Sequence, residues 1–162
     1  VLSVTVFVLG FVAFVASLFL AAAVLVPKGY EFDPADAQVW WSLLGAAGYL
    51  ALAAVMSVGF GALLRNSAGT IATVLGLLLV LPTILQLIGG LTQATWLTDA
   101  NAFLPSSVGS TMASPPMSQE ELDMFGMGDM LVLQPYQAAL VMLGWAVIPF
   151  VAGLIAMKRR DV

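Results

Sequence analysis

The sequence has no cysteine and no histidine, and only 9 % of its 162 residues are charged. Without cysteine, this chain can form neither disulfides nor thiolate metal sites. Without histidine, it lacks the commonest general base, the commonest metal ligand and the usual pH switch. Soluble domains contain about 25 % charged residues. Because 61 % of this chain is hydrophobic, we expect most of it to lie in lipid.

Four long apolar segments account for this composition. A helix needs about 20 apolar residues to cross a hydrocarbon core about 30 Å thick, and the backbone groups of each segment must be satisfied within the segment. The expected helices span about residues 1–26, 41–64, 69–90 and 137–157. The sequence therefore predicts an all-α integral membrane protein, a polytopic helical bundle that forms one transmembrane domain over residues 1–162.

The chain begins at Val1, inside the first apolar run, and no basic segment precedes that run. A cleaved signal peptide would start with such a basic segment. We therefore expect this chain to be the C-terminal portion of a longer protein.

The charged residues fall into two groups that alternate between the expected helices. After the first and third helices come one lysine and eight acidic residues: Lys28, Glu31, Asp33, Asp36, Asp99, Glu120, Glu121, Asp123 and Asp129. After the second and fourth helices come four basic residues and one acidic residue: Arg65, Lys158, Arg159, Arg160 and Asp161. Basic residues in short loops mark the cytoplasmic side. We therefore expect a multi-pass protein of the cell membrane, with the Arg65 hairpin and the C-terminus cytoplasmic and with loops 27–40 and 91–136 outside.

Arg65 is the one charged residue between two long uncharged stretches. The simplest interpretation is that Arg65 anchors a tight cytoplasmic hairpin, whose turn contains Asn66, Ser67 and Gly69. Lys158, Arg159 and Arg160 would anchor the C-terminus in the same way. Aromatic residues that favour the membrane interface lie at the expected helix ends: Trp40, Trp41, Trp96 and Tyr136.

The loop at 91–136 is long for a simple connection, which is typical of functional or disordered loops. Pro105 followed by two serines predicts the start of one short helix. Ser118 and Glu121 have the spacing of a capping box, which predicts the start of a second. We expect both helices to lie at the outer leaflet or to dip into it, separated by Pro115 and Pro116.

The same loop is rich in methionine: Met112, Met117, Met124, Met127 and Met130. Thioethers can bind Cu(I). Methionine also packs adaptably against lipid or protein surfaces. Because the spacing is irregular and no Cys or His accompanies these residues, we expect packing rather than a metal site.

Small and polar residues distinguish the second and third expected helices. Ala53, Ser57 and Gly61, with Gly45 and Gly48, predict a stripe on which another helix packs closely. In the third helix Pro82 is expected to cause a bend, since it removes a backbone hydrogen bond. Thr83 and Gln86 would either satisfy that bend and each other or line a polar pathway for a substrate.

The expected spans lack the groups that several function classes need. None contains the Asp, Glu, Lys or Arg that ion-coupled transporters use near the midplane. No P-loop motif is present, so we expect no cofactor in this chain. With neither histidine nor cysteine nor a buried carboxylate, an intramembrane enzyme has few candidate groups. We therefore expect a non-enzymatic protein with lipid as a partner, no catalytic or metal residues, and no nucleic-acid partner.

Three motifs occur in a fixed order within residues 40–162. The stretch GFGALLRNSAGTIATVLGLLLVLPTIL covers residues 59–85, FLPSSVGSTM covers 103–112, and MKRRDV covers 157–162. Together they resemble permease subunits of the ABC type-2 exporter family, which have a G-x-L-L-R-x-x-A-G hairpin, an apolar helix ending near VLP, an LPS-x-x-G outer segment and an RRRD tail. The outer segment of this chain would contain Leu104, Pro105, Ser106 and Gly109.

The resemblance implies six helices with cytoplasmic termini, of which this chain has the last four. It implies a second permease copy or homologue as partner, and separate subunits that bind ATP. ATP hydrolysis would drive export of a hydrophobic or amphipathic substrate, and the outer segment would form short re-entrant helices. Arg65 would then have a second role as a contact to the ATPase subunit. The stretch at 112–130 departs from the family pattern and leaves the substrate open.

A different class of function stays open on the sequence alone. The chain would then be a non-transporting membrane scaffold or immunity-type protein that binds partners through its outer loop. A P-loop ATPase encoded beside this protein would favour the exporter, whereas a partner captured by the outer loop without any ATPase would favour the scaffold.

Overall fold

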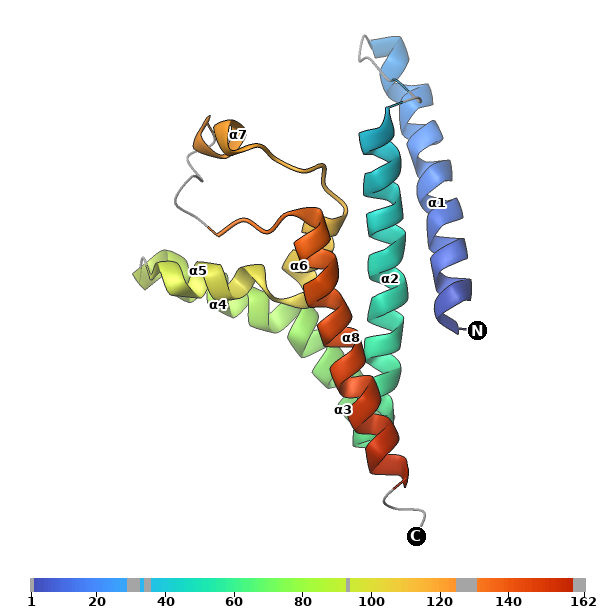
Figure 1. Ribbon diagram of the computed structural model, residues 1–162, viewed down its shortest axis with the longest axis vertical. Coiled ribbons are helices and arrows are strands. Elements are labelled where there is room, and N and C mark those ends of the chain that lie inside the picture. The colour runs from blue at the N-terminus through green and yellow to red at the C-terminus, as the bar shows by residue number, and fades with distance from the viewer. Residues whose placement is uncertain (1, 29–32, 34–35, 93, 125–130, 159–162) are drawn as a thin grey trace.

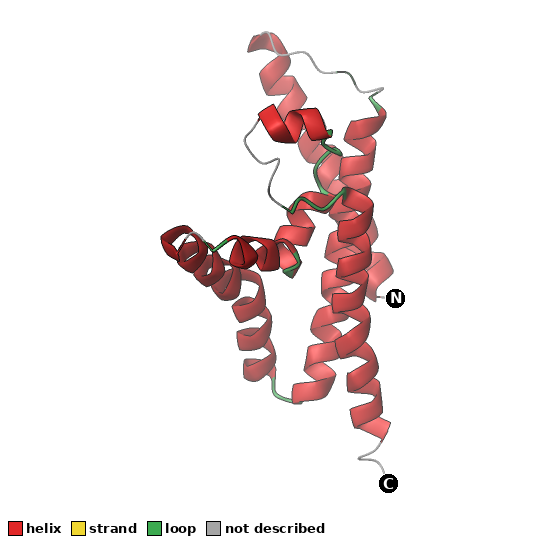
Figure 2. Cartoon of the chain, turned by 60° about the vertical axis from the view of Figure 1, so that its left-hand side comes forward, coloured by secondary structure: helices red, strands yellow, loops and turns green. Residues whose placement is uncertain are grey.

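A computed structural model describes residues 2–28, 33, 36–92, 94–124 and 131–158, apart from the side chains of Leu25 and Gln119. Within these ranges every regular element is a helix and no strand occurs (Figure 2). Four of the described helical segments are long and apolar enough to cross a membrane: Leu2–Lys28, Ala37–Leu64, Ser67–Thr92 and Pro135–Lys158. The described part of the chain is therefore all-helical, as predicted from the sequence, and it has the four long apolar helices that were expected; we refer to these four segments as spans.

The first two spans form an antiparallel pair (Figure 1). Helix α1 (Leu2–Leu25) continues into the short 3-10 helix η1 (Val26–Lys28), and helix α2 is Ala37–Leu64. The two helices contact each other where Phe11 faces Trp40, with ring centroids 6.5 Å apart. Helix α2 begins at Ala37 rather than at residue 41 because the Asp36 side chain caps it, accepting a hydrogen bond of 2.9 Å from the Gln38 N–H.

The third span consists of three parts and changes direction between them. Helix α3 (Ser67–Leu75) is followed by the π-helical segment η2 (Gly76–Val80) and by helix α4 (Leu81–Thr92). Figures 1 and 2 show that α3 runs beside α2 and that α4 then turns away from α2 and α8. The sequence led us to expect a bend here, attributed to Pro82 alone. The bend coincides with the π-helical segment, which ends just before Pro82.

The connection between the third and fourth spans contains three described short helices. They are α5 (Thr95–Ala102), α6 (Pro105–Met112) and α7 (Gln119–Met124). The sequence predicted the last two, and the expectation of only two helices was wrong. Helix α5 was missed because Ala94 precedes it without a capping side chain, so the usual start signal is absent.

The capping box at the start of α7 is confirmed. The Ser118 N–H donates to Glu121 Oε2 at 2.7 Å, and the Glu121 N–H donates to Ser118 Oγ at 3.3 Å. Two peptide N–H groups that the helix itself leaves unpaired are thus satisfied reciprocally.

Helix α8 (Pro135–Lys158) packs against α2 and α6, and the buried core lies between these three helices. Met56, Met142 and Val108, one from each helix, are completely buried. Helices that lie in lipid have no hydrophobic force between them, so close packing would hold these helices together in a membrane.

The close packing depends on glycines, and the sequence pattern identified only some of them. A Cβ on Gly59 would collide with the backbone at Pro149 and Phe150, and a Cβ on Gly45 would collide with the Met112 backbone. Gly61, by contrast, has only Thr70 Cγ2 nearby, at 3.9 Å. The expected stripe of Ala53, Ser57 and Gly61 was therefore wrong at Gly61, because the contact face of α2 passes through Gly59 instead.

The two ends of the molecule differ in their charge. The α2–α3 turn at Arg65 and the end of α8 lie together at one end, at the bottom of Figure 1. The start of α2, the start of α8 and the acidic helix α7 lie toward the opposite end. We call these the basic end and the acidic end.

Candidate functional site

A polar groove of about 280 Å³ lies between the bent third span and α6. It combines two segments that the sequence had singled out separately, the bend in the third span and the serine-rich segment after Pro105. Its lining residues are Leu78, Leu79, Pro82, Thr83, Gln86, Ser106, Ser107 and Ser110. All of the polar side chains in this lining are uncharged.

On one side, the groove is shaped by the irregular backbone near Pro82. Proline has no N–H to donate, and the π-helical segment before it shifts the hydrogen bonds, so that the Leu81 N–H donates to the Gly76 carbonyl. The Thr83 hydroxyl donates to the Leu79 carbonyl at 2.6 Å. Thr83 thus makes a hydrogen bond within the third span at the bend. The Gln86 side chain is exposed and makes no hydrogen bond to the described residues.

On the other side, the groove is formed by the first turn of α6. Leu104 is extended and Pro105 takes the first helical position, where a missing N–H costs nothing. Ser106 and Ser107 follow in the first turn, whose N–H groups have no partner within the helix. The local sequence therefore brings peptide N–H groups and serine hydroxyls together at one point.

Ser106 has a buried hydroxyl without a hydrogen-bond partner among the described residues. Ser110, in contrast, donates to the Ser107 carbonyl at 2.7 Å. A buried unpaired polar group costs about 1–3 kcal/mol, so such groups in native structures usually have a water or ligand partner. The groove offers neutral donors and acceptors and no formal charge, which suits amide or hydroxyl groups rather than ions.

Two further residues of the expected outer segment serve packing rather than the groove. Leu104 is buried, and Gly109 lies against the ring of Tyr49, where a Cβ would be 2.6 Å from Cε2. Helix α6 is thus held against α2 on one side and exposes its serines toward α4 on the other. The Trp145 Nε1–H donates to the Phe103 carbonyl at 2.9 Å, which fixes the α5–α6 connection to α8. The sequence did not indicate this hydrogen bond between Trp145 and Phe103.

The sequence analysis also missed Ser107 and Ser110 as groove residues. Ser110 contains the signal, because it follows Ser106 by four residues and Ser107 by three, and positions three and four apart in a helix lie on one face. A serine-rich face on an eight-residue helix next to an apolar span is therefore the pattern that would have indicated them.

At the basic end, Arg65 terminates α2 in the left-handed conformation, with φ of 51°. Its N–H donates to the Gly61 carbonyl at 3.0 Å, and Asn66 then caps α3 by accepting from the Ala68 N–H at 3.0 Å. Ser67 and Gly69, which were expected in the turn, belong to α3 instead, because the Asn66 cap starts the helix at once. Arg65, Asn66, Ser67, Thr70 and their neighbours line an open hollow of about 300 Å³.

Lys158 is the last residue of α8 and lies at the basic end with Arg65. Arg159 and Arg160, expected as anchors beside it, lie outside the described residues. The same holds for Met127 and Met130 of the outer loop.

The described methionines of the outer connection do not share one environment. Met112 belongs to the buried core, Met117 is half-buried, and Met124 is 81 % exposed. Among the described residues, no three acidic side chains lie close enough to hold a metal ion. Packing accounts for Met112 but not for Met124.

At the acidic end, hydrogen bonds tie the connection to its neighbours. The Gln134 Nε2–H donates to the Met117 carbonyl at 3.0 Å, and the Leu131 N–H donates to Asp99 Oδ1 at 3.3 Å. In the capping box, the backbone hydrogen bond from Ser118 and then that of its hydroxyl lower the pKa of the Glu121 carboxyl. Glu121 therefore stays ionised at the exposed surface of α7.

Comparisons of the chain with protein families, with curated proteins and with solved structures found no match.

Proposed function

We propose that this chain is the membrane-spanning permease subunit of an ATP-driven transporter of the ABC type-2 exporter class, and that a separate subunit hydrolyses ATP. The observation that carries this proposal is the uncharged polar groove between α4 and α6, next to the bend in the third span. A groove of neutral donors and acceptors within an otherwise apolar helix assembly suits the polar part of a hydrophobic or amphipathic substrate.

The groove is well placed to change shape during a transport cycle. One of its walls follows a π-helical segment, and such segments are frequent at functional sites. The other wall, α6, is fixed through Gly109 to α2 and through the neighbouring Phe103 to α8. A change of the bend would therefore widen or narrow the groove while α2, α6 and α8 stay together.

The energy for transport would come from outside this chain. The described spans contain no charged side chain that could couple to an ion gradient, with Lys158 and Lys28 only at helix ends. A separate ATPase would act at the basic end, where Arg65 is exposed in the α2–α3 turn. A second copy or a homologue would complete the pathway, and this chain would supply the third to sixth helices of a six-helix subunit.

In this proposal the basic end faces the cytoplasm and the acidic end faces the exterior. Four of the five basic residues of the sequence follow the second and fourth long helices, and this supports the orientation, because basic residues in short loops are retained on the cytoplasmic side. Helices α5, α6 and α7 would then form the outer segment, with α6 re-entering between α4 and α8.

The proposal is tested by purifying the full-length protein from its own membranes in mild detergent and identifying the proteins that accompany it. We expect a stoichiometric P-loop ATPase whose rate of hydrolysis changes when this subunit is present. Purification of the protein with no ATPase, under conditions that keep a known transporter intact, would contradict the proposal. A partner bound through exposed α7 in that experiment would support the scaffold or immunity-type function instead.

A further inference from the structure

A second cavity lies at the acidic end and is separate from the polar groove. Its volume is about 570 Å³, which falls in the range of about 300–1,000 Å³ that is typical of small-molecule sites. It lies where the start of α2, the segment after α6 and the start of α8 meet. The polar groove is lined by the third span and α6. Helix α6 therefore contributes residues both to the groove and to this cavity.

Rigid and small residues keep this cavity open. Pro115, Pro116 and Pro135 line it, and their fixed backbone angles limit how far the walls can collapse. Gly45 allows the Met112 backbone to lie directly against α2, where a Cβ would collide with it. Backbone segments of fixed geometry therefore form part of the cavity wall.

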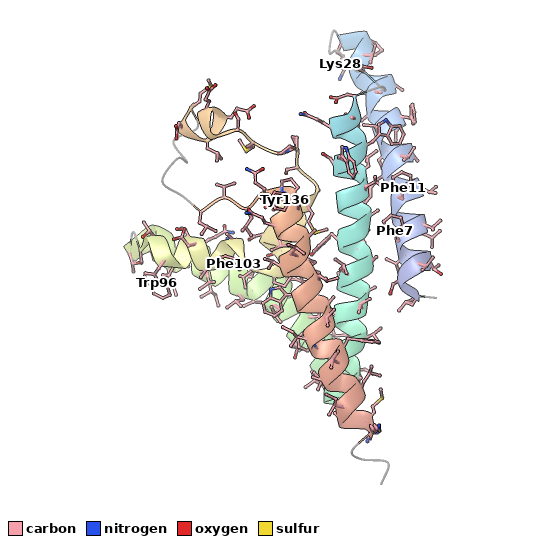
Figure 3. All side chains as sticks on the ribbon, in the orientation of Figure 1. Phe7, Phe11, Lys28, Trp96, Phe103 and Tyr136 are labelled. Atoms are coloured by element: carbon pink, nitrogen blue, oxygen red, sulfur yellow. The ribbon has the colours of Figure 1, made fainter. Side chains whose placement is uncertain are left out.

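Two aromatic residues of the lining are unusually exposed. Trp41 is 71 % exposed and Tyr136, labelled in Figure 3 at the start of α8, is 66 % exposed. Trp and Tyr favour the interface between lipid and water, where the ring is apolar and the polar tip stays wet. Their ring faces also attract cations. The rest of the lining is largely apolar, with the neutral Gln38, Ser42 and Gln134 among it.

The segments that flank the cavity lining along the chain carry mainly acidic side chains. Asp36 caps α2 two residues before Gln38, and α7, which begins three residues after Pro116, exposes Glu120 and Glu121. Across the two connections at this end the sequence has eight acidic residues against the single Lys28. Lys28 lies on η1, beyond the end of α1 (Figure 3).

We propose that this cavity binds the apolar part of an amphipathic cation, whose positive charge is stabilised by the Trp41 and Tyr136 rings and attracted by Asp36 and the other acidic side chains of the acidic end. A neutral lipid tail would gain nothing from the carboxylates, and an anionic amphiphile would be repelled by them. The apolar lining and the acidic surroundings together thus favour a cation with a hydrophobic group. The inference goes beyond the proposed transport, because binding at this cavity requires neither an ATPase nor movement of the ligand.

The test uses the full-length protein in nanodiscs of zwitterionic phospholipid. Two dansyl-labelled dodecyl probes, one with a trimethylammonium head and one with a hydroxyl head, are titrated by fluorescence anisotropy. We expect saturable binding of the trimethylammonium probe, tighter than that of the hydroxyl probe by about tenfold, since charge pairs and cation–π contacts at exposed sites are each modest. Binding should weaken as salt is added. Equal binding of both probes, or no saturation by either, would overturn the inference.

Matched variants locate the site. Trp41→Ala combined with Tyr136→Ala should weaken binding of the cationic probe by about tenfold, whereas Tyr136→Phe, which keeps the ring, should not. Trp96→Ala removes an equally exposed tryptophan on α5 and should change nothing. Asp36→Asn keeps the helix cap. Combined with Glu120→Gln, it should weaken binding of the trimethylammonium probe and leave binding of the hydroxyl probe unchanged. If Trp96→Ala had the same effect as the Trp41 and Tyr136 pair, the cavity would not be the site.

Discussion

Gly153 of α8 lies over the carbonyl oxygen of Gly59 in α2, so closely that a Cβ added to Gly153 would stand 2.9 Å from that oxygen. The two glycines let the helix backbones approach near the basic end. Met56 and Met142 then fill the space further along the same contact. Lipid provides no hydrophobic force between helices, so in a membrane this contact would decide whether the pair is stable.

Gly59→Ala should therefore destabilise the protein. The new methyl group would meet the backbone at Pro149 and Phe150, neither of which can move as a flexible side chain could. Overpacking of this kind costs about 1–3 kcal/mol, which should appear as a lower apparent unfolding temperature in mild detergent. Gly61→Ala is the matched control, because only Thr70 Cγ2 lies near it. Equal loss from both variants would show that the backbone contact is not the cause.

Arg65→Gly separates the backbone role of Arg65 from its charge. The left-handed conformation costs a non-glycine residue roughly 1–2 kcal/mol, so glycine at this position should leave thermal stability unchanged or raise it. In the proposed function the arginine contacts the ATPase, and the same variant should weaken copurification of that subunit. Arg65→Lys keeps the charge and should retain the ATPase. Lower stability of Arg65→Gly would contradict the backbone role, and copurification of the ATPase with this variant would contradict the contact through the arginine.

Ser106→Ala tests whether the polar groove binds anything. Its buried hydroxyl has no partner among the described residues, so its removal should leave stability unchanged or improve it. A neutral hydrogen bond to a ligand is worth about 0.5–1.5 kcal/mol, so the KM for the transported substrate should rise roughly 2- to 10-fold. Ser57→Ala removes a hydroxyl that lies outside the groove and donates to the Ala53 carbonyl, and it serves as the control. An unchanged KM of Ser106→Ala would show that the groove does not bind the transported substrate.

Acidification should release the start of α7. The pKa of Glu121 lies below its ordinary value of 4.5 because Ser118 donates hydrogen bonds to the ionised carboxylate. A lowered pKa means that the capping box is fully formed above that ordinary value and is lost as the pH falls through the lowered pKa. Amide hydrogen exchange at residues 118–122, corrected for the intrinsic pH dependence, should therefore show falling protection below pH 4.5.

Glu121→Gln keeps a capping side chain that does not titrate. Its protection at residues 118–122 should be independent of pH over the same range. If the variant lost protection in parallel with the wild type, another group would be responsible for the change.

The helices were predictable from sequence where a single physical signal was strong. Apolar length indicated the four spans, and Ser118 with Glu121 indicated α7 through their spacing alone. The end of α2 at residue 64 was predicted correctly, but the next helix starts at Ser67 instead of about residue 69, because Asn66 caps α3. The propensities of single residues indicate that a turn is present, but the capping residue determines where the next helix begins.

The groove was predictable only in part. Pro82, Thr83 and Gln86 were recognisable on their own helix, but their position opposite Ser106 depends on how far the third span bends. That bend depends on a π-helical segment with no sequence signature of its own. The contact between Gly59 and α8 was missed for a similar reason, since small residues recur along α2 and the sequence does not show which of them faces a partner.

The central claim is that a separate ATPase acts on this chain at its basic end, and site-specific cross-linking tests it most directly. This chain has no cysteine, so a cysteine at Ser67, exposed in the α2–α3 turn region, gives it a single thiol. A cysteine at exposed Ala113, toward the acidic end, is the matched control. With a short thiol-to-amine cross-linker in native membranes, Ser67→Cys should capture a P-loop ATPase and Ala113→Cys should not. Capture of an ATPase from neither position, or from Ala113 alone, would contradict the account.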